Sequence, residues 1–117
     1  MYDKSSLQTT EDGFSFTIKN SIANGNVVEV FLLALNDEEI PFPNITIENE
    51  TQKMSADKIS SENPVELRKG VTTTFNVVKD NLGDLVDKEV KIHMKFKVQV
   101  RESKMTIDFD FQDTLTG

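Results

Sequence analysis

The residues best suited to acid-base chemistry in this 117-residue chain are its only histidine and two aspartates near the C-terminal end. Asp108 and Asp110 are two residues apart, so both carboxylates project from one side of a strand. With His93 they contain the groups of an acid-base site, but a general base also needs an orienting partner and a pocket. The same pattern offers Lys95 and Lys97 as ion-pair partners for the aspartates. We therefore interpret these carboxylates as structural and predict no catalytic residue.

Other catalytic and metal-binding chemistries have little support in the sequence. The absence of cysteine excludes disulfides, thiolate nucleophiles and zinc-thiolate centres, and a single histidine excludes a multi-histidine metal site. The acidic stretch 37–39 lacks the alternating ligand and glycine spacing of a calcium loop. There is no Gly-x-Ser-x-Gly elbow and no glycine-rich phosphate loop. The sequence therefore predicts a protein that is not an enzyme and that has no cofactor.

The charge of the chain limits its partners. A formal net charge of −7 disfavours binding to nucleic acid, which draws most of its free energy from cations that neutralise phosphates. An anionic membrane surface is disfavoured for the same reason. The longest apolar run, Val30 to Leu35, is far shorter than the roughly 18 residues of a spanning helix. Residues 1–4 show no signal-peptide pattern.

Two acceptor sequences for N-linked glycosylation lie close together. They are Asn44-Ile45-Thr46 and Asn49-Glu50-Thr51. The modification requires an exported protein, because the motif is read only outside the cytosol. Asn44 and Asn49 are therefore the candidate glycosylation sites, and chance occurrence in a chain rich in Asn and Thr is the alternative.

Alternating apolar and polar residues predict the elements that must position these groups. We expect a flexible lead-in over residues 1–12 and a single domain over residues 13–117. The turn 20–26 includes Asn24-Gly25, a strong hairpin turn pair. The predicted fold is an all-β, immunoglobulin-like antiparallel β-sandwich of about 6–8 strands. The strand segments are 14–18, 27–35, 45–50, 71–77, 90–100 and 105–111, with a long connection or weak edge strand over 51–63.

The last two segments predict a long hairpin with its own register. If Glu102 and Ser103 form a two-residue loop, Val100 lies opposite Met105, and the apolar residues of both strands share one face. The same register places Lys97 opposite Asp108 and Lys95 opposite Asp110. Each such pair of opposite charges contributes roughly 0.2 to 1 kcal/mol to stability.

The segment 27–35 is apolar at every position except Glu29. A strand with this composition needs cover on both faces, from its own domain or from another chain. We therefore expect the interface residues to come from this segment. They are Val28, Val30 and Leu32, or the alternate set Val27, Phe31 and Leu33.

The sequence Pro64-Val65-Glu66-Leu67-Arg68-Lys69-Gly70-Val71-Thr72-Thr73-Thr74-Phe75 is followed by a Leu-Gly-Asp-Leu-Val turn and a lysine-flanked strand. Over about residues 14–111 this pattern resembles the soluble, pilin-like domains of the archaellum accessory proteins F and G. The resemblance implies a non-enzymatic anchoring domain of the archaeal motility machinery, bound to an archaellum or surface-layer protein and forming a homodimer. It also implies an extracytoplasmic location in the cell envelope, with an N-terminal membrane helix before the present sequence.

The alternative function is an exported ligand-binding sandwich, such as a carbohydrate-binding or adhesin-like module. Such modules stack aromatic rings on sugars. The chain has no tryptophan, and most of its phenylalanines fall on the apolar side of their predicted strands, which counts against this alternative.

Overall fold

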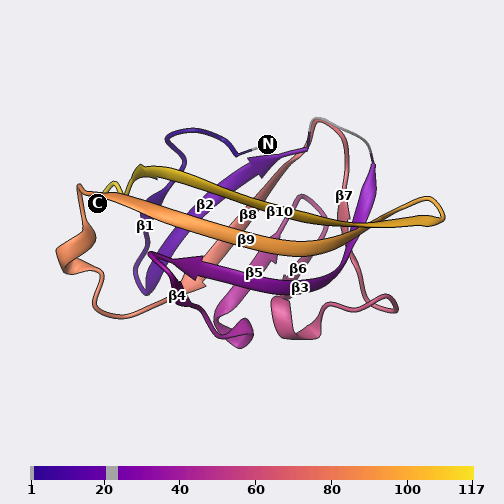
Figure 1. Cartoon of the computed structure of the whole chain (residues 1–117), viewed down its shortest axis with the longest axis horizontal. Helices are drawn as coiled ribbons and strands as arrows, with labels where there is room; N and C mark the ends of the chain where they lie inside the picture. Colours follow the sequence, from indigo (N-terminus) through magenta and orange to yellow (C-terminus); the bar gives the residue numbers. More distant parts are fainter. Residues whose placement is uncertain (1, 21–23) are drawn as a thin grey trace.

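Ten β-strands and three short 3-10 helices form the part of the chain that the computed structural model describes, residues 2–20 and 24–117 (Figure 1). The middle of the predicted turn 20–26 lies outside the described residues. In chain order the elements are β1 (Gln8–Thr9), β2 (Gly13–Lys19), β3 (Gly25–Leu35), β4 (Glu38–Glu39), η1 (Phe42–Asn44), β5 (Ile45–Glu48), β6 (Lys53–Ser55), η2 (Ala56–Lys58), β7 (Val65–Leu67), β8 (Thr72–Val78), η3 (Gly83–Leu85), β9 (Glu89–Val100) and β10 (Ser103–Thr114).

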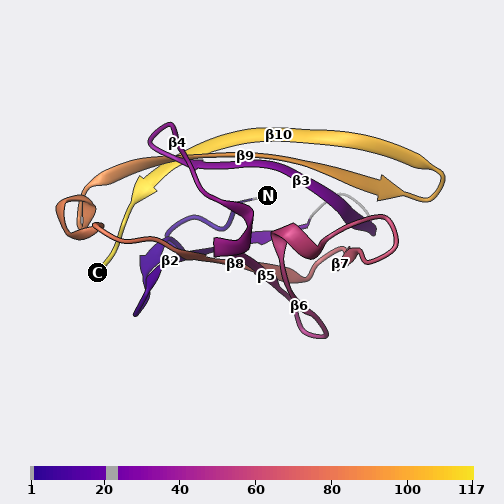
Figure 2. The same ribbon diagram turned by 90° about the horizontal axis from the view of Figure 1, so that it is seen from below.

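The strands form two antiparallel sheets that lie in two layers (Figure 2). The first sheet has the order β1-β2-β8-β5-β6, and the second has the order β10-β9-β3-β4, with β7 also paired to β3. The described residues include no α-helix and no helix long and apolar enough to cross a membrane. The prediction of an all-β, sandwich-like fold is confirmed. The strand count exceeds the predicted 6–8 because β1, β4, β6 and β7 have only two or three residues, too few to show alternation.

The core lies between the two sheets and is rich in aromatic rings. Phe16 of β2 stacks on Phe75 of β8 with ring centroids 5.1 Å apart, and both side chains are buried. Phe96 of β9 is buried in the opposite layer. Burial of each such side chain stabilises the fold by roughly 1.5 to 3 kcal/mol. Gly13 allows the close approach of β2 to β8, since a Cβ atom there would lie 1.7 Å from the carbonyl oxygen of Val77.

The hairpin of β9 and β10 has the predicted faces but not the predicted register. Val100 lies opposite Ser103, so the two-residue loop is Arg101-Glu102 and Met105 lies opposite Val98. The predicted register is therefore wrong by two residues. A slip of two residues keeps every side chain on its face, so the period-2 pattern does not distinguish the two registers. The turn decides between them, with Arg101 in the left-handed region at φ +56°.

The shifted register also changes the ion pairs on the outer face of the second sheet. Lys95 lies opposite Asp108 and His93 lies opposite Asp110, so the predicted pairs Lys95 with Asp110 and Lys97 with Asp108 are wrong. The observed pairs are diagonal or reach a third strand. They join Lys91 to Asp110 at 3.7 Å, His93 to Asp108 at 2.6 Å and Lys97 to Glu29 at 3.9 Å.

Residues 2–12, for which the sequence predicts a flexible lead-in, lie against the sandwich. The side chain of Leu7 is fully buried. The ring of Tyr2 stacks on Phe111 of β10, with centroids 3.6 Å apart and an interplanar angle of 11°. Its hydroxyl donates a hydrogen bond to Asp113 Oδ2 at 2.7 Å, and the backbone N–H of Ser5 donates to the same oxygen at 2.8 Å. These contacts fasten the first residues to the last strand.

The contact of Tyr2 with Asp113 makes stability depend on pH at both extremes. Burial, together with this hydrogen bond, raises the pKa of Tyr2 from 10 to about 12. The bond lowers the pKa of Asp113. In the unfolded chain Tyr2 ionises at the lower pH, so its contribution is lost as pH rises from about 10 to 12. The contribution of Asp113 is lost as pH falls below about 4, through the folded-state pKa.

We expect Tyr2→Phe to keep the ring stack, to lower the free energy of unfolding at pH 7 by about 0.5 to 1.5 kcal/mol, and to flatten the profile at both extremes. Urea unfolding of both proteins across pH measures this difference. Asp113→Asn should flatten the acid limb more than the alkaline limb, because burial is the largest cause of the raised pKa of Tyr2. Parallel profiles for the parent and Tyr2→Phe would contradict the assignment.

Candidate functional site

The predicted interface residues of β3 separate into two groups. Val27, Val30 and Leu33 are buried in the core between the sheets, and Val28 is also buried. Packing within the single chain therefore accounts for the burial of these four side chains. Phe31 and Leu32 are only partly buried.

The second of two irregularities in β3 explains why two consecutive apolar residues reach the surface. The pairing of β3 with β9 shifts between Val27 and Glu29 and again between Val30 and Leu32. At the second shift, Leu32 lies opposite Lys95, and Phe31 is the extra residue of a bulge. Lys97 Nζ lies 5.5 Å from the centroid of the Phe31 ring, which places the ring on the outer face. We call Phe31, Leu32, Lys95 and Lys97 the outer patch.

The outer face also contains the contact of His93 with Asp108. The 2.6 Å distance between His93 Nε2 and Asp108 Oδ1 supplies the orienting partner that the sequence does not reveal. The predicted register does not reveal this contact, because it shifts every residue of β10 by two positions relative to His93. Side-chain exposures of 36% and 53% leave the pair open to solvent. Within the described residues, no three histidine or carboxylate groups are placed so that they could hold a metal ion.

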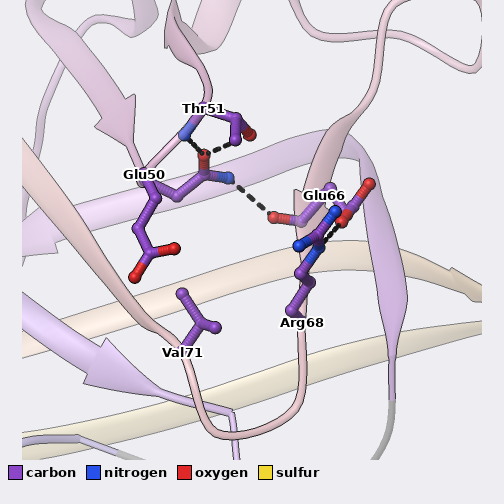
Figure 3. Close-up of a pocket in the computed structure, with 6 residues that line it drawn as sticks. Glu50, Thr51, Glu66, Arg68 and Val71 are labelled. Carbon is purple, nitrogen blue, oxygen red and sulfur yellow. Dashed lines mark hydrogen bonds and ion pairs between the residues drawn. The ribbon is translucent and has the colours of Figure 1, made fainter.

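A small cavity lies near the turn between β5 and β6, and six of its lining residues are drawn in Figure 3. Its volume is about 10 Å³, room for at most one water molecule. Glu66 and Arg68 form an ion pair on one side of it, and Glu50 and Val71 lie opposite. The cavity is lined by Asn49, Glu50, Thr51, Glu66, Arg68 and Val71.

Asn49, one of the glycosylation candidates, organises this region through its side chain. Its Oδ1 accepts hydrogen bonds from the backbone N–H groups of Thr51 and Gln52, both at 2.9 Å. Its Nδ2 donates to the carbonyl oxygen of Glu66 in β7 at 2.8 Å. Because the β5–β6 turn belongs to the first sheet and β7 to the second, this amide links the two layers. A glycan would be attached to the same nitrogen that makes the link.

Asn44, the other candidate, has a weaker structural role. Its Nδ2 donates one hydrogen bond, to the carbonyl oxygen of Val78 at 3.3 Å. Asn44 and Asn49 are both partly buried. Glycosylation at either position stays a prediction.

The two asparagines form a matched pair for a stability test. We expect Asn49→Ala to lower the free energy of unfolding by about 1 to 3 kcal/mol, since it leaves three backbone groups without their partner. Asn44→Ala, which removes one long hydrogen bond, should cost less than about 1 kcal/mol. Urea denaturation of the two variants measures both values, and equal losses would show that Asn49 does not link the sheets.

An all-β domain with an apolar patch on one outer sheet face is the class of protein that the geometry defines. Comparison with protein families then identifies it more closely. The family model described as "Hydroxymethylglutaryl-CoA reductase, N-terminal domain" matches residues 1–116. The chain belongs to this family. A comparison with curated proteins gives no match.

The family match corrects the functional expectations drawn from the sequence. The resemblance to the archaellum accessory proteins is wrong, and with it the anchoring role and the alternative of a carbohydrate-binding or adhesin-like module. The expectation that the chain has no part in an enzyme is also wrong, because the family is a domain of a reductase. Residues 64–75, which suggested the archaellum, form β7, the following turn and the start of β8. Strands and turns of this kind occur in many sandwiches and do not specify a family.

Proposed function

We propose that this chain works as the N-terminal domain of a hydroxymethylglutaryl-CoA reductase, an enzyme of the mevalonate pathway, and contacts the rest of that enzyme through the outer patch. The observation that carries the proposal is the second bulge in β3. It places Phe31 and Leu32 side by side on the sheet face that also presents His93, Lys95 and Lys97. Bulges re-aim side chains, and partly exposed aromatic residues are common anchors of protein interfaces.

The surroundings of Phe31 and Leu32 also suit a protein contact. The cations of Lys95 and Lys97 flank the two apolar side chains, in a chain with a net charge of −7. Lys97 pairs with Glu29 at 3.9 Å, whereas Lys95 forms no ion pair within the described part of the chain. An apolar centre with a charged rim is the usual anatomy of an interface. The cationic rim favours an acidic surface on the remainder of the reductase.

We also propose that the sandwich has immunoglobulin-like topology. In that fold, strands A, B, E and D form one sheet and strands C, F and G form the other. If β1, β2, β3, β5, β8, β9 and β10 are assigned to strands A to G in that sequence, the sheet orders become A-B-E-D and G-F-C. β4 then lies beside strand C, where variable-type domains have strand C′. This agreement in strand order supports the finer assignment.

A photo-crosslinking residue at position 31 of the full-length reductase tests the outer patch. We expect irradiation to join position 31 to peptides outside residues 1–117, which mass spectrometry identifies. The matched control is position 78, because Val78 is 45% exposed and lies in the other sheet. Equal yields from the two positions would contradict the patch. Reduction of hydroxymethylglutaryl-CoA by the same full-length protein tests the family role separately.

A further inference from the structure

β10 is an edge strand of unusual length for this fold. It has twelve residues, all in continuous register with β9, and contains no proline. The other strands at the ends of the two sheets, β1, β6 and β4, have only two or three residues. Proteins commonly keep edge strands short or bulged, because a long regular edge invites pairing with another chain. Figure 1 shows the far end of the β9–β10 hairpin extending beyond the other strands.

The backbone groups that point away from β9 follow from the hairpin geometry. In a two-residue loop, the flanking residues Val100 and Ser103 exchange both hydrogen bonds. Odd-numbered residues of β10 therefore direct their N–H and C=O groups toward β9, and even-numbered residues direct theirs toward the open edge. Within the described residues, β10 is paired in a sheet with β9 alone. The outward residues of its first eight are Lys104, Thr106, Asp108 and Asp110.

We propose that two copies of this chain associate by antiparallel pairing of their β10 edges, around a twofold axis at Ile107. This register places Lys104 opposite Asp110 of the second copy, twice, and Thr106 opposite Asp108. All four residues direct backbone groups outward, so each pair exchanges two hydrogen bonds. A continuous sheet then crosses the dimer.

The charges along β10 disfavour two of the neighbouring registers. An axis at Asp108 places that residue opposite its own copy, and an axis at Phe109 places Asp108 opposite Asp110. An axis at Thr106 also places Lys104 opposite Asp108, twice, but its paired segment is shorter, because Glu102, which would lie opposite Asp110, belongs to the hairpin loop. Like charges directly opposite each other destabilise a strand pair, so the axes at Asp108 and Phe109 are disfavoured.

The inner face of β10 gives a second reason for the pairing. Met105 is 46% exposed, and Ile107 and Phe109 are only partly buried against the core. In the proposed register Met105 lies opposite Phe109 of the second copy, and Ile107 lies opposite its own copy. These pairs cover apolar surface that the single chain leaves in water. The outer patch stays open, so the dimer is independent of the proposed contact with the rest of the reductase.

Charge reversal at the edge tests the dimer by sedimentation of the 117-residue chain over a range of concentrations. We expect the parent chain to dimerise, and Lys104→Asp or Asp110→Lys alone to weaken the dimer by about tenfold or more, since each change creates two like-charge pairs. The double variant restores both pairs and should recover the parent dissociation constant. Lys53→Asp, an equal charge change on edge strand β6, is the matched control and should have no effect.

A variant that blocks the edge without changing charge completes the test. Thr106→Pro removes one outward N–H and should give a folded monomer, with folding followed by circular dichroism. A parent chain that is monomeric at every concentration would overturn the proposal. So would a dimer that persists in both single charge variants, or one that the double variant fails to restore, because each result would place the contact elsewhere.

Discussion

The pairing of β9 with β10 on one side and β3 on the other is the constraint on which the other surface features depend. Along β10 the pairing is regular for twelve residues, and along β3 it shifts twice. On the regular side, the outward backbone groups of β10 have no partner strand within the described residues. The shifted side brings Phe31 and Leu32 to the surface beside Lys97. One central strand therefore sets both the apolar patch on the sheet face and the open edge.

The sequence predicts the faces of the strands well, because a period of two is visible over six or more residues. Register and bulges are harder to predict. A shift of two residues in the hairpin leaves Met105 and Phe111 on the same face, and only the backbone of Arg101 distinguishes the alternatives. In β3 an almost unbroken apolar run cannot show which residue is extra. Because of this, the sequence does not predict the contact between His93 and Asp108, and it assigns Phe31 and Leu32 to alternative sets although both are partly exposed.

The resemblance to the archaellum accessory proteins is misleading for a related reason. The segment 64–75 follows the rules for an extended strand, a turn with Gly70 at φ +86° and a second strand, and these rules hold in any sandwich. Asn49 illustrates the same difficulty at a single residue. Its sequence context predicts a modification site, whereas its amide holds a turn and links two sheets. A short motif is compatible with both roles, and only the three-dimensional contacts separate them.

The stack of Tyr2 on Phe111 has a consequence for how the domain folds. During synthesis Tyr2 and Leu7 leave the ribosome before the rest of the sandwich, and the hydrogen-bond partner of Tyr2 follows 111 residues later. Leu7 pairs its carbonyl oxygen with the N–H of Thr116. Tyr2 and Leu7 therefore complete their contacts only when almost all of this domain has been synthesised. Closure of the sandwich at this end depends on contacts between residues far apart in the sequence, and contacts of this kind slow folding.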